Sequence, residues 1–145
     1  MTKDATSRRR VYLPLDDASL AQLDESKVLD GKGIHGYAVT PELRESEPNE
    51  DAEGLEYLAM QDAATAAAGR DLRVVAAVDL DPQQVGEGAH GDVDTEVSLL
   101  GDVRLRWVAS LHVLDPAGER DVDSDLELSW YDVTELPDVR TLLQS

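Results

Sequence analysis

Apolar residues recur along the chain with two different periods, and these periods predict strands alternating with helices in its first half. Apolar side chains at every second position predict a strand over 10–15, which Pro14 should close because proline has no N–H to donate. Helical spacing of apolar residues then predicts a short helix over about 17–29. A nearly unbroken apolar run over 34–40 is typical of a strand that is covered on both faces and paired in parallel.

The clearest local signal is a helix start after this second strand. Thr40 can accept backbone N–H bonds, Pro41 fits the first helical position, and Glu42 suits the positive end of the helix dipole. A second cap, Asn49, opens the longest predicted helix, about 49–69. One stripe of that helix is leucine and alanine, so we expect the helix to pack closely on a sheet.

The second half of the chain reads mainly as strands joined by glycine-rich and proline-rich turns. The predicted elements are a central strand over 73–79, a loop over 83–94, an extended run over 95–100, strands over 107–114 and 126–131, and a helix over about 134–143. The pattern predicts an α+β (or α/β) fold: a single mixed sheet of about five to six strands, with the 49–69 helix on one face and a short C-terminal helix.

Alternation in the last strand predicts which of its aromatic side chains is buried. Trp130 follows Leu126 and Leu128 at every second position, so we expect Trp130 in the core and its neighbour Tyr131 at least partly exposed. Asp132 and the glutamate three residues later resemble a capping box that introduces the terminal helix.

The length of 145 residues suits one ordinary domain, and we expect a flexible tail over 1–9 followed by a single globular domain over 10–145. The chain has no cysteine, which removes disulfides and thiolate chemistry and fits a reducing, cytoplasmic location. No uncharged run reaches the length that a membrane-spanning helix needs.

Charge changes the picture more than any other compositional feature. The whole chain carries a formal charge of −18, and residues 11–145 together hold nine basic and 30 acidic side chains. Such a surface repels phosphate backbones and anionic lipids, so we expect neither nucleic-acid nor membrane binding. The charge serves solubility, adaptation to salt, or a partner with a basic surface. The sequence leaves the oligomeric state open.

Several motifs resemble a known family. They comprise Arg10-Val-Tyr-Leu-Pro14, Tyr37-Ala-Val-Thr-Pro-Glu-Leu-Arg44, Leu55-Glu-Tyr57, Arg73-Val-Val-Ala-Ala77, Leu128-Ser-Trp-Tyr131 and Glu135-Leu136. Together these stretches resemble a family of short actinobacterial proteins catalogued as a domain of unknown function. The resemblance spans nearly the whole chain and implies a single domain and a bacterial cytoplasmic origin. It implies no activity, ligand or catalytic residue.

Aspartates supply the weak candidates for a metal site. Asp121, Asp123 and Asp125 have the first three ligand spacings of a calcium loop, but the sixth position lacks its glycine and the twelfth its glutamate. Asp79 and Asp81, with Asp92 and Asp94, could meet around magnesium. Aspartates beside turns more commonly make local hydrogen bonds, so we expect no metal and no cofactor.

The other chemistry-bearing residues have structural explanations. His35, His90 and His112 lie far apart in the sequence, and His112 is better explained as a satisfied core or edge residue. Ser110 and Ser129 lack the glycine-flanked turn of a serine nucleophile. Arg104 and Arg106, two apart, could hold a carboxylate or phosphate from one strand face, but a solvated pair that answers the acidic surface is the better explanation.

Two functions from different classes follow. The first is a non-catalytic acidic binding or accessory module for a protein with a basic surface; the absence of a recognisable catalytic motif makes this the better hypothesis. The alternative is a small metal- or phosphate-dependent enzyme with a site where the strands end at Pro14, Thr40 and Asp79, as open α/β sheets often have. A pocket there that gathers carboxylates or His35 would favour the enzyme.

Overall fold

A computed structural model describes residues 8–32, 34–86, 93–116 and 126–144. Within these residues, 3₁₀ turns at Pro82–Gln84, Leu105–Trp107 and Val133–Glu135 connect strands and helices. In chain order the latter are β1 (Arg9–Leu15), α1 (Asp17–Ser26), β2 (Val28–Leu29), β3 (His35–Ala38), α2 (Pro41–Ser46), α3 (Ala52–Gly69), β4 (Val74–Leu80), β5 (Val85–Gly86), β6 (Glu96–Leu99), β7 (Val103–Arg104), β8 (Val108–Leu114), β9 (Leu128–Asp132) and α4 (Leu136–Leu143).

A seven-stranded sheet in the order β5-β6-β3-β1-β4-β8-β9 organises the described residues, and β2 and β7 form a second, two-stranded sheet. The α+β prediction is confirmed, with more strands than the five to six expected. The predicted parallel pairing of neighbours was wrong, because every described pair of adjacent strands is antiparallel.

The short first helix explains the antiparallel start. Ten residues of α1 span only about 15 Å, and the chain then forms β2 instead of continuing the helix to 29 as predicted. The next strand, β3, therefore pairs antiparallel to β1, with Tyr12 opposite Tyr37. By contrast, β3 and β4 run in the same direction on either side of β1, and α3 connects them. The predicted strand–helix–strand unit thus exists with β1 inserted between its strands.

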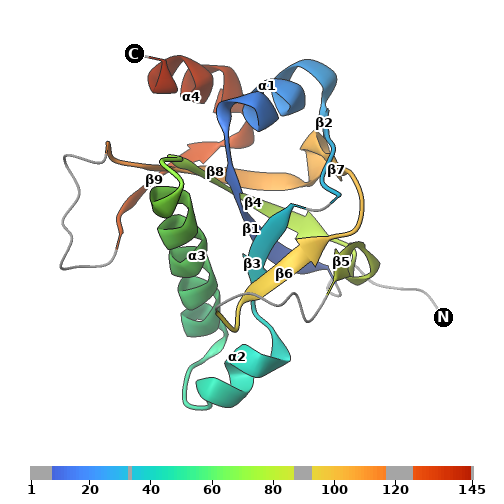
Figure 1. Cartoon of the computed structure of the whole chain (residues 1–145), viewed down its shortest axis with the longest axis vertical. Helices are drawn as coiled ribbons and strands as arrows, with labels where there is room; N and C mark the ends of the chain where they lie inside the picture. The colour runs from blue at the N-terminus through green and yellow to red at the C-terminus, as the bar shows by residue number, and fades with distance from the viewer. Residues whose placement is uncertain (1–7, 33, 87–92, 117–125, 145) are drawn as a thin grey trace.

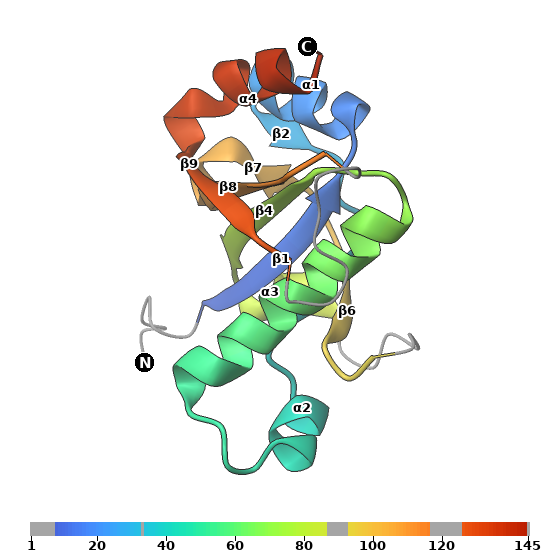
Figure 2. The same cartoon turned by 90° about the vertical axis from the view of Figure 1, so that its left-hand side faces the viewer.

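The main sheet is covered differently on its two faces (Figure 1, Figure 2). One face carries alternate residues of β1 such as Val11 and Leu13, and it packs with apolar side chains of α1, α4 and the β2-β7 sheet. The other face carries Tyr12, Val75 and Ala77, on which the alanines of α3 pack. As predicted, β4 is central and buried on both faces.

Local signals placed most helix boundaries correctly. Thr40 caps α2 by accepting a hydrogen bond from the Leu43 N–H at 3.1 Å. The capping box predicted at Asp132 forms as expected and introduces the turn before α4. The start of the long helix differs from its prediction: α3 begins at Ala52 with Asp51 as its cap, since the Asp51 side chain accepts a hydrogen bond from the Gly54 N–H at 2.8 Å.

The predicted burial of Trp130 was wrong. Its side chain is 61% exposed, while Tyr131 is half-buried and packs against the larger core cluster. Alternation correctly places Trp130 on the same face as Leu128, but β9 is an edge strand and α3 packs over β1, β3 and β4 instead. The helix therefore reaches Leu126 and Leu128 but leaves Trp130 uncovered. None of the helices in the described part of the chain is long and apolar enough to span a bilayer.

Candidate functional site

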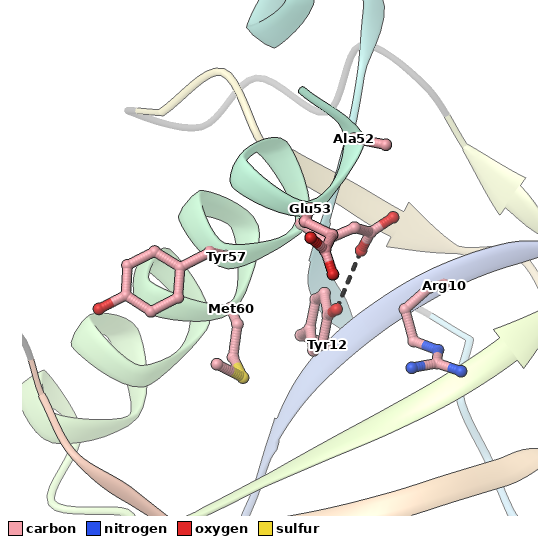
Figure 3. A pocket seen from close by; sticks show the side chains of 7 residues that line it. Arg10, Tyr12, Ala52, Glu53, Tyr57 and Met60 are labelled. Carbon is pink, nitrogen blue, oxygen red and sulfur yellow. Dashed lines mark hydrogen bonds between the residues drawn. The ribbon is translucent and has the colours of Figure 1, made fainter. Parts of the chain in front are cut away.

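A concave site lies between β1 and the first turns of α3, and we call it the helix hollow. Its volume is about 560 Å³. Figure 3 shows Arg10 on the strand side and Tyr57 and Met60 on the helix side. Its lining residues are Arg10, Tyr12, Ala52, Glu53, Glu56, Tyr57 and Met60.

Two periodicities build this hollow. Strand alternation in β1 sends Arg10 and Tyr12 to the face that α3 covers. On the helix, Glu53, Glu56 and Met60 recur at intervals of three and four residues, which places them on one stripe facing the strand. Carboxylates, a thioether and two phenol rings therefore line one hollow together with the half-buried Arg10 guanidinium.

Tyr12 is the most strongly perturbed group of the helix hollow. Its hydroxyl donates a hydrogen bond to Oε1 of Glu56 at 2.9 Å. Burial of the ring raises the pKa of Tyr12 well above its ordinary value, and the adjacent Glu56 carboxylate raises that pKa further. Tyr12 is consequently a neutral hydrogen-bond donor at physiological pH and does not act as a base.

Arg10 is held by a carboxylate from the neighbouring strand. Its Nε and Nη2 donate to the two oxygens of Asp79 at 2.6 and 3.1 Å, and β1-β4 pairing places the two residues opposite each other. The hydrogen bond to Asp79 is the largest cause that raises the pKa of Arg10. The Asp79 carboxylate therefore joins β4 to β1 beside the hollow.

A serine–histidine pair lies on the same sheet face, on β8. The Ser110 hydroxyl and His112 Nε2 are 2.9 Å apart, and Ser110 is buried. Burial lowers the pKa of His112, and the positive charge of Arg10 lowers it further, so the imidazole is neutral at pH 7. Within the described residues no hydrogen bond orients the other ring nitrogen as a catalytic triad requires. The pair satisfies a buried hydroxyl, as was expected for His112.

The structure brings two of the predicted metal candidates together. Asp79 and Asp81 line one hollow of about 300 Å³, but Asp79 binds Arg10 and Asp81 caps the following 3₁₀ turn. Asp121, Asp123 and Asp125 lie outside the described residues. Among the residues that are described, no group of three potential ligands is suited to a metal ion.

The strand ends proposed for the enzyme do not share one edge of the sheet. Pro14, near the end of β1, is opposite Val75 at the start of β4, whereas Asp79 is opposite Arg10. Because β1 is antiparallel to its neighbours, its carboxyl end lies at the other side of the sheet. His35 contacts the Glu96 carboxylate on β6, and His90 and Asp92 lie outside the described residues.

Arg104 and Arg106 were expected to project from one strand face, and the structure shows otherwise. β7 ends at Arg104, and a 3₁₀ turn follows, so the two side chains are not on one strand face. Both guanidinium carbons nevertheless lie 5.9 Å from the centroid of the Trp107 ring. They line a second pocket with Lys27, which is 77 residues earlier in the sequence and which sequence reasoning did not connect with them.

A family model matches residues 9–139, which is most of the chain. The chain belongs to the family of unknown function DUF6912. Membership in DUF6912 confirms the family resemblance drawn from the strand and helix-start motifs, while the actinobacterial origin stays a prediction. No curated protein matches the chain. No solved structure matches it either.

Sequence reasoning missed the helix hollow because its parts are separated in the chain. Tyr12 and Glu56, which share a hydrogen bond, are 44 residues apart. The spacing of Glu53, Glu56 and Met60 was a usable signal, since it marks a helix stripe that interrupts leucine and alanine with acidic residues. That stripe alone does not reveal which strand faces it.

Proposed function

We propose that the protein is a non-catalytic binding module that docks a protein with a basic surface at its acidic end. We define the acidic end as residues 42–56, which hold seven carboxylates and one arginine. Six of the seven acidic side chains are exposed, on α2, the following turn and the start of α3. Figure 2 shows this end of the molecule away from α1 and α4.

The observation that carries the proposal is the helix hollow beside this charge. Glu53 is exposed at the rim and Glu56 lies deeper against Tyr12. Tyr57 is 43% exposed and Met60 is half-buried on the same helix. Carboxylates next to an aromatic ring and a thioether suit a lysine or arginine side chain, which combines charge with an apolar stem. An exposed tyrosine is also a frequent anchor of protein interfaces.

If electrostatic attraction drives the binding, the affinity for the partner should depend on the salt concentration. The net charge of the whole chain is −18, so a basic partner is steered towards it at low ionic strength. The screening length falls from above 10 Å to below about 5 Å as salt rises from about 0.05 to 0.5 M. The affinity for the partner should therefore weaken across this range.

The test starts with capture of partners from the native host on the immobilised full chain, followed by purification of the retained protein and calorimetric titration. Glu45→Gln with Glu53→Gln removes two exposed charges from the acidic end. Asp17→Asn with Asp138→Asn removes two exposed charges from α1 and α4 and serves as the matched control. We expect the first pair to weaken binding roughly 3- to 10-fold, mainly through slower association, and the control pair to have a much smaller effect.

Two outcomes would contradict the proposal. Affinity that is unchanged in high salt, or equal losses in both charge pairs, would mean that the acidic end does not make the contact. A stoichiometric bound metal, or turnover in a phosphatase or esterase screen, would support the enzyme alternative.

A further inference from the structure

We infer that the protein has a second binding site, for a small organic anion, in a pocket that we call the basic pocket. The pocket has a volume of about 600 Å³, within the range of small-molecule sites. Its lining residues are Ser26, Lys27, Val28, Arg104, Leu105, Arg106, Val133 and Thr134. They come from the end of α1 with β2, from β7 and its 3₁₀ turn, and from the turn before α4.

Backbone contacts fix the cationic residues relative to one another. In the two-stranded sheet, Val28 is opposite Arg104. The carbonyl of Lys27 accepts a hydrogen bond from the Leu105 N–H at 2.9 Å, which joins the end of α1 to the 3₁₀ turn. Lys27 ends α1 in the left-handed conformation, at φ 64°, where most residues other than glycine are disfavoured. The backbone positions of the basic pocket are therefore set before any ligand binds.

The charge of the basic pocket is opposite to that of the rest of the protein. Three of the nine basic residues beyond position 10 line it, and its described lining contains no carboxylate. Arg104 and Arg106 make no ion pair with any described residue, and the Nζ of Lys27 donates to the backbone carbonyl of Asp24. In a chain of net charge −18, three cations without a carboxylate partner among the described residues call for an anion.

Nearby carboxylates are already bound elsewhere. The Asp24 and Glu25 side chains contact the guanidinium of Arg140 on α4, at 2.8 and 3.4 Å. The Asp132 carboxylate accepts hydrogen bonds from the backbone and hydroxyl of Thr134, which lowers the pKa of Asp132. The Asp24 and Glu25 carboxylates are thus paired with α4, and the Asp132 carboxylate is paired with Thr134 at the edge of the basic pocket.

The remaining lining determines the class of ligand. Val28, Leu105 and Val133 give the basic pocket apolar walls, while the Thr134 hydroxyl donates its proton to Asp132. Guanidinium groups bind the oxygens of phosphates and carboxylates, often with two hydrogen bonds. The pocket therefore fits an oxyanion head group, a phosphate or a carboxylate, attached to an apolar body. The basic pocket shares no lining residue with the helix hollow. A test of anion binding there is therefore independent of the proposed protein binding.

Trp107 provides a reporter for the basic pocket because both arginine side chains lie against its ring. The chain has two tryptophans, so Trp130→Phe leaves Trp107 as the single emitter. Phenyl phosphate and benzoate are titrated into this variant, with phenol as the uncharged control of the same ring. We expect a saturable change in Trp107 emission for at least one of the two anions, with dissociation constants at least about tenfold lower than that of phenol.

Substitutions then locate the bound anion. Arg104→Gln with Arg106→Gln should weaken its binding by about tenfold or more, whereas Arg44→Gln, an exposed cation on α2, should leave it unchanged. Circular dichroism checks that the arginine variant is folded. Lys27→Asn is the second variant, because asparagine tolerates the positive φ of this position. Lys27→Asn should also weaken anion binding. Three results would overturn the inference. They are a failure of both anions to bind saturably up to about 10 mM, binding of phenol as tight as that of the anions, and a loss of binding in Arg44→Gln as large as in the arginine pair.

Discussion

Replacing Gly36, in β3, by alanine should lower the free energy of unfolding, although the strand backbone itself accepts alanine. A Cβ atom at this position would lie 2.6 Å from Cγ1 of Val11 and 2.7 Å from Cδ2 of Leu13 on the neighbouring strand. Ordinary contacts of a Cβ are 3.4–4 Å, and both neighbours are fully buried in the core. Gly36→Ala therefore forces the packed β1-β3 contact to open.

The expected cost follows from two opposing effects. Overpacking of a close-packed core costs about 1–3 kcal/mol, and replacing glycine by alanine returns about 0.4–1 kcal/mol through the entropy of the unfolded chain. Contacts as short as 2.6 and 2.7 Å put the overpacking cost of Gly36→Ala in the upper part of its range, about 2–3 kcal/mol. The net loss should then be about 1–2.6 kcal/mol, or a melting temperature lower by roughly 3–10 °C for a domain of this size. At Gly69, the last residue of α3, an added Cβ would meet nothing within 4 Å, so Gly69→Ala should stabilise the protein by about 0.4–1 kcal/mol.

Urea denaturation of the parent and both variants, followed by far-ultraviolet circular dichroism, measures these free energies of unfolding. The same chemical change should thus have opposite signs at the two positions. A Gly36→Ala protein as stable as the parent would refute the reasoning, because the close approach of β3 to β1 would then have room to relax. An equal loss in Gly69→Ala would show that the cost arises from the loss of glycine and not from the contact.

Two further predictions concern the face of the sheet that α3 partly covers. Trp130→Ala should change the free energy of unfolding by less than about 1 kcal/mol, because its side chain is 61% exposed; a loss above about 3 kcal/mol in chemical denaturation would place the ring in the core. Tyr12 has a raised pKa in the folded protein and an ordinary value near 10 when unfolded, so the unfolded state loses its proton first as the pH rises. The stabilisation from Tyr12 should be fully present below about pH 10, and the free energy of unfolding should fall above it. Tyr12→Phe should reduce this dependence of the free energy of unfolding on pH, as measured in denaturation curves. An unchanged dependence on pH would contradict the assignment to Tyr12.

The chain sequence determined the local features of this protein. The cap at Thr40, the capping box at Asp132 and the end of α3 at Gly69 depend on neighbouring residues only, and each lies where the sequence placed it. The central position of β4 was also evident, because a strand with apolar residues on both faces needs cover on both. These signals act over a few residues, so no knowledge of the rest of the fold is required.

Tertiary structure decided strand direction and the burial of the last strand. The periodicity around β1 and β3 suits either direction; the ten-residue α1 and the insertion of β1 between β3 and β4 make the neighbours antiparallel. Alternation gives the face of Trp130, but only the path of α3 determines whether that face is covered. Burial is a property of what packs on a residue, and the residue's own neighbours in sequence do not specify it.

The two candidate sites depend on tertiary structure for the same reason. Tyr12 meets Glu56 across 44 residues because α3 packs on β1. Lys27 and Arg104 line one pocket because β2 pairs with β7, a two-residue pairing too short to be recognised from its pattern. The sequence supplied the charges and their spacing. The packing of distant elements concentrated carboxylates beside the helix hollow and cations in the basic pocket, since only the folded chain brings such separated side chains within the range of one ligand.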